Sequence, residues 1–219
     1  MTTSKKESYR TVSRRGEGVL IEKKSRFIAS VSPAETEDAA IEFINGIRAK
    51  YPDARHNVYA YIIDENNISR YSDDGEPQGS AGIPVLNVIQ KENLVDTVVV
   101  VTRYFGGILL GTGGLARAYG QTAKLGITDA VIVERNLCDI VSIKTDYTLE
   151  GRIRYKISSE GYISDDTIYG NDVTFIVYTK CGETQKFIDA VTDITNGRAA
   201  CDITGVKYVD FDSGGGKNR

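Results

Sequence analysis

The sequence predicts an α+β protein of two domains, and two patterns along the chain indicate this class. Up to about residue 135, short stretches with strand alternation are interleaved with stretches of helical periodicity. The pattern then starts again at Cys138 with its own set of apolar positions. Because each segment can bury its own core, we expect domains at residues 1–135 and 136–212, followed by a flexible tail at residues 213–219.

The first domain is expected to be a two-layer α/β sandwich after a polar, frayed stretch at residues 1–16. Ser32-Pro33-Ala34-Glu35 has the form of a capping box with proline at the first helical position, and Pro52 follows the same helix. Strands are expected at 18–23, 26–31, 57–64, 68–71, 98–101 and 131–134, and helices at 32–50, at 84–92 and from Leu115 onward.

The second domain shows a shorter and simpler order of elements. The pattern predicts a strand near 141–147, a helix at 149–157, a hairpin of 162–169 with 172–180, a helix at 187–194 and a closing strand at 201–211. The order β-α-β-β-α-β is typical of the ferredoxin-like arrangement, which is the fold that we expect for this domain.

Composition and charge restrict the environment and the kind of ligand. The net charge is −3 and the isoelectric point is about 5.4, so any recognition of phosphate must be local. The three cysteines are widely spaced and form no CxxC pair, which favours a reducing compartment. The polar N-terminal segment does not resemble a signal peptide, and no apolar run is long enough for a membrane span. We therefore expect a cytoplasmic protein with no membrane partner.

The most informative segment runs from Gly106 to Gly114, where five of nine residues are glycine. It follows an apolar strand and leads to a predicted helix start, where backbone amides lack intrahelical partners. Such a segment predicts an anion pocket, flanked by positive charges from Arg103 and Arg117. The candidate ligand-binding residues are Arg103, Gly106, Gly107, Gly111, Thr112, Gly113, Gly114 and Arg117, with Ser72 and Gln78 from the preceding loop.

Two other interpretations of the glycines remain open. The run from Gly111 to Ala116 matches a permissive dinucleotide-binding pattern, with Glu134 at the distance expected for a ribose-binding acid. Alternatively, the glycines only allow a helix and a sheet to pack closely together.

Three carboxylates, Asp73, Asp74 and Glu76, lie in a turn-rich loop at residues 72–82. They can form a solvated turn, pair with Arg103 and Arg117, or hold Mg²⁺ beside a phosphate. Without a cation, carboxylates repel a nearby phosphate, so pairing with the arginines is the expected arrangement. No cofactor other than Mg²⁺ is suggested.

His56 is the only histidine, so any histidine-dependent catalysis depends on this residue. Ser72 or Ser80 with His56 and Asp73 can be drawn as a catalytic triad, but the chain has no G-x-S-x-G nucleophile motif. Catalytic candidates are therefore limited to His56 and the three carboxylates. A binding protein is expected rather than an enzyme.

Three segments resemble the YigZ/Impact family: RHNVYAY at residues 55–61, YSDDGEPQGSAG at 71–82 and VVVVTRYFGGILLGTGGLARAY at 98–119. The resemblance implies a first domain of the ribosomal-protein domain-2-like type and a ferredoxin-like second domain. It also implies a role in translational control, because eukaryotic relatives act there. We accordingly expect a translation-associated regulatory protein that binds RNA or the ribosome at the glycine-rich segment. A metal-assisted hydrolase or phosphate-transfer enzyme, or an adaptor for a translation-associated protein, are the alternatives.

Overall fold

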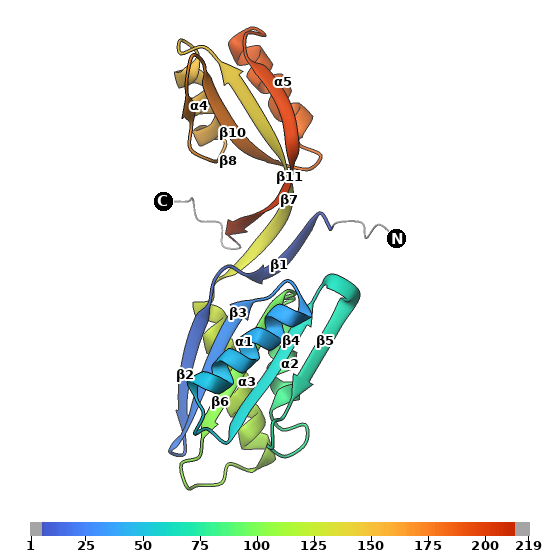
Figure 1. Cartoon of the computed structure of the whole chain (residues 1–219), viewed down its shortest axis with the longest axis vertical. Helices are drawn as coiled ribbons and strands as arrows, with labels where there is room; N and C mark the ends of the chain where they lie inside the picture. Colours follow the sequence, from blue (N-terminus) through green and yellow to red (C-terminus); the bar gives the residue numbers. More distant parts are fainter. Residues whose placement is uncertain (1–5, 213–219) are drawn as a thin grey trace. The chain divides into compact units, whose positions relative to one another are not determined.

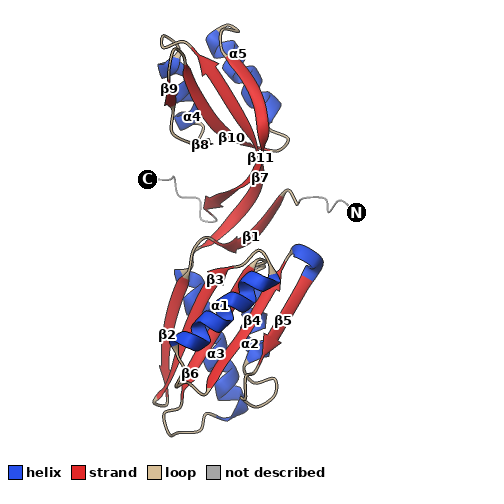
Figure 2. Ribbon diagram, viewed as in Figure 1, coloured by secondary structure: helices blue, strands red, loops and turns tan. Residues whose placement is uncertain are grey.

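The computed structural model describes residues 6–212, so the predicted tail at 213–219 lies outside the described residues. The chain forms two compact units, and the division falls between Glu134 and Arg135, with Ser8 belonging to the second unit. Each unit combines helices with antiparallel strands (Figures 1 and 2), which confirms the α+β class. No helix within residues 6–212 has the length and apolar character needed to cross a membrane.

The first unit is built on a five-stranded antiparallel sheet with the order β2-β3-β6-β4-β5. Its strands are β2 (Gly16–Glu22), β3 (Ser25–Pro33), β4 (His56–Ile63), β5 (Ile68–Ser72) and β6 (Thr97–Tyr104). Its helices are α1 (Glu37–Lys50), α2 (Gly82–Lys91) and α3 (Gly111–Asp129), with a short 3-10 turn at Glu65–Asn67. Apart from the strand expected at 131–134, the predicted strands and helices of this domain are present, with shifted ends.

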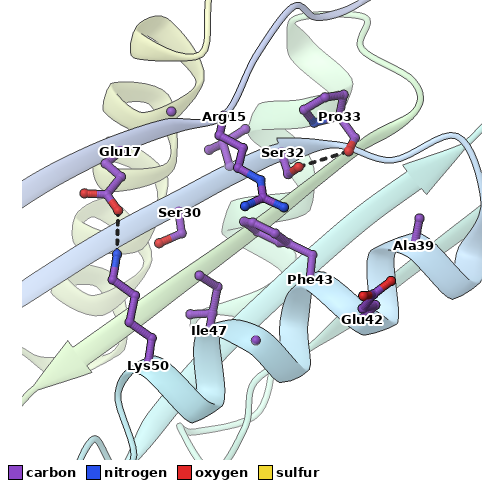
Figure 3. A pocket seen from close by; sticks show the side chains of 13 residues that line it. Arg15, Glu17, Ser30, Ser32, Pro33, Ala39, Glu42, Phe43, Ile47 and Lys50 are labelled. Carbon is purple, nitrogen blue, oxygen red and sulfur yellow. Dashed lines mark hydrogen bonds and ion pairs between the residues drawn. The ribbon is translucent and has the colours of Figure 1, made fainter.

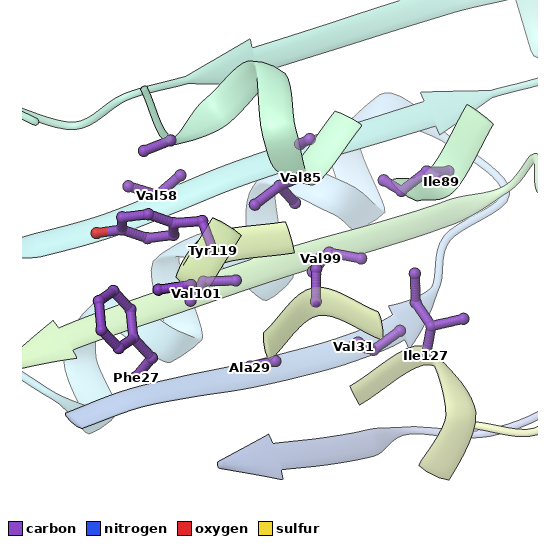
Figure 4. Close-up of a cluster of buried hydrophobic side chains, with 14 of the residues drawn as sticks. Phe27, Ala29, Val31, Val58, Val85, Ile89, Val99, Val101, Tyr119 and Ile127 are labelled. Carbon is purple, nitrogen blue, oxygen red and sulfur yellow. The ribbon is translucent and has the colours of Figure 1, made fainter. Parts of the chain in front are cut away.

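Helices cover both faces of this sheet, so the unit has three layers rather than the expected two. On one face, α2 and α3 pack on a core that includes Phe27, Val99 and Tyr119 (Figure 4). On the other face, α1 packs over Val98 and Val100. The valine run of β6 explains the difference, because a strand that is apolar on both sides needs a covering layer on each.

Two helix starts differ from the prediction. The capping box expected from Ser32 is wrong: β3 continues to Pro33, and the Thr36 hydroxyl caps α1 by accepting a hydrogen bond from the Ala39 amide at 3.2 Å. Helix α3 begins at Gly111, not at Leu115. The glycines from Gly111 to Gly114 therefore form the first turn of the helix, which changes where its free amides lie.

The second unit has the order β11-β7-β10-β8, the ferredoxin-like order that the sequence predicts, and β9 also pairs with β10. Its core includes Val141, Phe175 and Phe187. The elements are β7 (Ile132–Thr145), α4 (Glu150–Ser159), β8 (Ile163–Ser164), β9 (Ile168–Tyr169), β10 (Val173–Lys180), α5 (Thr184–Thr195) and β11 (Ala200–Asp212).

Two expectations near the unit boundary are wrong. The strand predicted at 131–134 and the next strand are one continuous element, β7. Of the stretch 1–16 that was expected to be frayed, residues 1–5 lie outside the described residues, and the rest includes β1 (Ser8–Val12), which pairs with β7. Side chains alternate along the whole of β7, so this one strand accounts for both of the strands that the pattern predicted at 131–134 and near 141–147. The three cysteines are free thiols, as the sequence indicates.

Candidate anion site at the N-terminus of α3

A cavity of about 420 Å³ lies in the first unit, beside the N-terminus of α3. We call it the α3 cavity. Four parts of the chain meet there: the start of β4, the acidic loop, the end of β6 and the segment that leads into α3. Its lining consists of Arg55, His56, Glu76, Pro77, Arg103, Phe105, Leu109, Leu110, Gly111, Thr112 and Leu115.

The first turn of α3 has no side-chain cap. Leu110 occupies the N-cap position without a capping hydrogen bond, and the first turn carries no acidic residue. The amides of this turn therefore lack intrahelical partners, and the positive end of the helix dipole lies at Gly111 and Thr112, which line the cavity. Such a terminus favours a bound anion, most often a phosphate, sulfate or carboxylate.

The glycines of this segment have different structural roles. Gly107 and Gly111 have positive φ angles of 85° and 72°, which glycine adopts without strain. A Cβ atom at Gly106 would lie 2.0 Å from the Lys24 carbonyl carbon, so this glycine is needed for close packing. A Cβ atom at Gly113 would meet no atom within 4 Å. Close packing therefore explains Gly106 but does not explain Gly113.

Arg103 is buried and its charge is balanced. Its Nη1 atom lies 2.6 Å from Glu76 Oε1, and the two side chains are only 7% and 4% exposed. The Tyr119 hydroxyl donates to the same carboxylate oxygen at 2.8 Å. The guanidinium carbon also lies 5.4 Å and 5.5 Å from the ring centres of Phe27 and Phe105. Arg103 thus anchors the wall of the cavity, and Glu76 shows the expected pairing of an acid with an arginine.

The buried Tyr119 hydroxyl should make stability depend on alkaline pH. Burial, and next the negative charge of Glu76, raise the pKa of Tyr119. In the unfolded chain the hydroxyl ionises at about pH 10, so the unfolded state loses this proton first as the pH rises. Stability from this group is therefore complete below about pH 10 and falls above it.

We expect Tyr119→Phe to remove part of the alkaline loss of stability. Urea unfolding at a series of pH values between about 8 and 11 measures the slope, because the window brackets the tyrosine pKa. The exposed Tyr155 provides a control through Tyr155→Phe, which should leave the slope unchanged. An unchanged slope in Tyr119→Phe would contradict the assignment.

The carboxylates of the acidic loop are directed to separate partners. Asp73 accepts hydrogen bonds from the amides of Gly79, Ala81 and Gly82 at 2.8–3.0 Å, and so caps the start of α2. Asp74 accepts from the Asn57 amide at 2.7 Å. Within residues 6–212, no group of three metal-ligating side chains is assembled. Magnesium binding by this loop stays a prediction.

His56 lies at the cavity in a defined orientation. Its Nδ1 atom is 2.9 Å from the Asp74 carbonyl oxygen, which can only accept a hydrogen bond. Nδ1 therefore carries the proton in the neutral ring, and Nε2 is left with a lone pair. Neither serine of the drawn triad bonds to His56: the Ser72 hydroxyl accepts from the Asp74 amide, and the Ser80 hydroxyl donates to the Pro77 carbonyl. The triad is thus not assembled.

Arg55 is the charged cavity residue that the sequence did not predict. Its side chain is exposed, lines the α3 cavity and has no ion-pair partner among the described residues. Arg117, in the second turn of α3, is exposed but does not line the cavity, and neither does the exposed Gln78. The available signal for Arg55 was its position directly before His56 at the start of β4. His56 lies opposite Arg103 in the β4–β6 pair, which places Arg55 near the end of β6.

The dinucleotide-binding interpretation of the glycines does not fit this sheet. That arrangement needs parallel strands joined by crossover helices, whereas every neighbouring pair in the five-stranded sheet is antiparallel. Glu134 lies on β7, outside that sheet.

Comparison with known proteins finds two separate family matches along the chain. Residues 23–127 match the Impact N-terminal domain, and residues 143–198 match a domain of unknown function, DUF1949. The chain is 43% identical over 193 residues to IMPACT family member YvyE of Bacillus subtilis (strain 168), which covers 88% of this chain and 89% of that protein.

Two further comparisons extend over most of the chain. An IMPACT family member from Thermus thermophilus is 35% identical over 178 residues, covering 80% of this chain and 96% of the relative. A crystal structure of a hypothetical protein aligns with a TM-score of 0.58 and 28% identity, covering 90% of this chain and 97% of that one. Because these relatives match over most of their own length and of this chain, the chain belongs to the IMPACT family.

Proposed function

We propose that this protein is a translation-associated regulatory protein that holds a phosphate group of RNA, on or near the ribosome, in the α3 cavity. The observation that carries the proposal is the uncapped first turn of α3 at the same cavity as Arg55, which has no ion-pair partner in the described part of the chain. Helix amides and a guanidinium group together bind phosphate through charge-assisted hydrogen bonds. The translational context comes from the family to which the chain belongs.

The rest of the cavity suits a nucleotide better than a free phosphate ion. Phe105 and Leu109 are 54% and 82% exposed on the segment that leads into α3. An exposed aromatic ring can stack on a base, and stacking supports binding of single-stranded RNA without a fixed sequence. The Nε2 lone pair of His56 can accept a hydrogen bond from a ribose hydroxyl. Phosphate, base and sugar thus each have a chemical partner.

Reversing the free charge of the cavity should disrupt RNA binding. We expect Arg55→Glu to weaken binding to ribosomes and to single-stranded RNA about tenfold or more, because a charge-assisted contact becomes a repulsion. Sedimentation with ribosomes and filter binding measure this change, and the wild-type affinity should fall steeply with salt. Lys91→Glu, an equal charge change at the exposed end of α2, is the control. Equal affinity of Arg55→Glu and the wild type would reject the site.

Gly113→Ala separates binding from folding. Alanine is the better helix former by up to about 1 kcal/mol, and its methyl group meets no neighbour here. We therefore expect no loss of stability, while RNA binding weakens because the methyl group crowds the first turn of α3 next to Thr112, which lines the cavity. Gly151→Ala, also in open space in the first turn of α4, should leave binding unchanged. Unchanged binding in both variants would support a purely structural role for Gly113.

The two alternative functions predict different results. A metal-assisted hydrolase or phosphate-transfer enzyme would be inhibited by a chelator, and its Mg²⁺ binding would be reduced by Asp74→Asn. An adaptor protein would show neither metal dependence nor steep salt dependence of RNA binding. The same set of measurements therefore distinguishes the three functions.

A further inference from the structure

A second cavity, of about 690 Å³, lies in the first unit between α1 and strands β2 and β3 (Figure 3). We call it the α1 groove. It shares no lining residue with the α3 cavity and faces the side of the sheet that α1 covers. Its volume is within the range of small-molecule sites.

A buried hydroxyl without a partner lies in this groove. Ser30 is 3% exposed, and its Oγ atom has no hydrogen-bond partner within the described part of the chain. Figure 3 shows its side chain in the space between Arg15, Ile47 and Lys50. Buried polar groups are normally hydrogen-bonded, so an unpaired hydroxyl here points to a partner that the chain itself does not supply.

The backbone of α1 is also accessible from the groove, at Gly46. Gly46 lines the groove in the interior of α1, where glycine is unfavourable, and a Cβ atom there would meet no atom within 4 Å. Gly126 of α3 shows the contrasting case, since its Cβ atom would lie 2.8 Å from the Ala29 Cβ atom. Packing within the chain therefore accounts for Gly126, whereas Gly46 is exposed and leaves the α1 backbone accessible to a ligand in the groove.

The charges of the groove sum to zero and include one unpaired group of each sign. Lys50 and Glu17 form an ion pair at 2.7 Å. Within residues 6–212, Arg15 and Glu42 have no ion-pair partner. The Arg15 guanidinium lies over the Phe43 ring, 5.6 Å from its centre, and Glu42 lies on α1 (Figure 3). A ligand with one negative and one positive group would satisfy both side chains.

We propose that the α1 groove binds a small zwitterion of the size of a short peptide. Its carboxylate pairs with Arg15 and its ammonium group with Glu42, while a polar atom on the side of Arg15 away from Glu42 bonds to the Ser30 hydroxyl (Figure 3). An apolar part of the ligand packs on Ile47 and on the open backbone at Gly46. The RNA site does not take part in this binding.

Isothermal titration of the full chain with Gly-X dipeptides, one for each amino acid, tests the proposal. We expect at least one dipeptide to bind, and its N-acetylated and C-amidated forms to bind about tenfold more weakly, because each lacks one charge. Gly46→Ala should fold at least as well as the wild type and lose binding, since its methyl group keeps the ligand away from the α1 backbone. Arg15→Ala should weaken binding by a similar factor, and Gly151→Ala should not change it.

The outcomes separate cleanly. Dipeptide binding that is lost in Gly46→Ala and Arg15→Ala, with RNA binding unaltered, supports the assignment. The absence of heat with every dipeptide, or equal binding by wild type and Gly46→Ala, overturns it. Arg55→Glu should bind the dipeptide as the wild type does. The dipeptide test therefore stays valid even if the RNA proposal fails.

Discussion

Replacing Glu76 by alanine is expected to lower the free energy of unfolding by about 3–5 kcal/mol, because it leaves the buried Arg103 guanidinium without its counter-charge. The pair is nearly free of solvent, with 7% and 4% of the two side chains exposed. The Tyr119 hydroxyl loses its acceptor in the same variant. Urea unfolding followed by circular dichroism measures the change.

A matched exposed pair provides the control for this prediction. Lys124 and Glu92 form an ion pair at 2.8 Å, with 48% and 25% of the side chains exposed. Glu92→Ala should cost no more than about 1 kcal/mol, because solvent screens the pair. The double variant Glu76→Leu with Arg103→Met should recover much of the loss, since apolar groups of similar size avoid an unpaired buried charge. Equal effects of Glu76→Ala and Glu92→Ala would contradict the role of the buried pair.

Gly106→Ala is expected to destabilise the first unit by roughly 3 kcal/mol or more, because overpacking against backbone atoms forces the chain to move. The added Cβ atom would lie 2.0 Å and 2.3 Å from the Lys24 carbonyl carbon and oxygen. The Gly106 amide also donates to the Ser25 hydroxyl at 3.1 Å, so displacement of the segment breaks this contact too. Thermal unfolding and amide hydrogen exchange of residues 105–110 measure the effect.

Gly113→Ala in the same glycine-rich segment is the control, because its methyl group enters open space. We expect Gly106→Ala to unfold more easily, and Gly113→Ala to retain stability but bind RNA less well. If both variants keep wild-type stability, the close approach between Gly106 and Lys24 is not required for folding. The comparison therefore tests whether these glycines have the separate roles that the structure gives them.

Local sequence patterns predicted most elements but not all of their ends. The period of apolar residues located α2 and the strands around β6, because burial of one helix face or two strand faces leaves a regular pattern. Pro33 looked like the first residue of a helix, yet it pairs with Thr97 at the end of β3. Glycine is a poor helix former, so the residues from Gly111 to Gly114 looked like a loop although they form the first turn of α3.

Residue types alone favoured an anion site near α3, because unpaired amides, glycines and arginines in one segment suit a bound anion. The tertiary structure decided which arginine at the cavity has no ion-pair partner among the described residues. Strand β4 pairs with β6 so that His56 lies opposite Arg103, which places Arg55 at the cavity, while the acidic loop brings Glu76 onto Arg103. These contacts join residues far apart in the chain, and their energies depend on burial, which no local pattern of residues records.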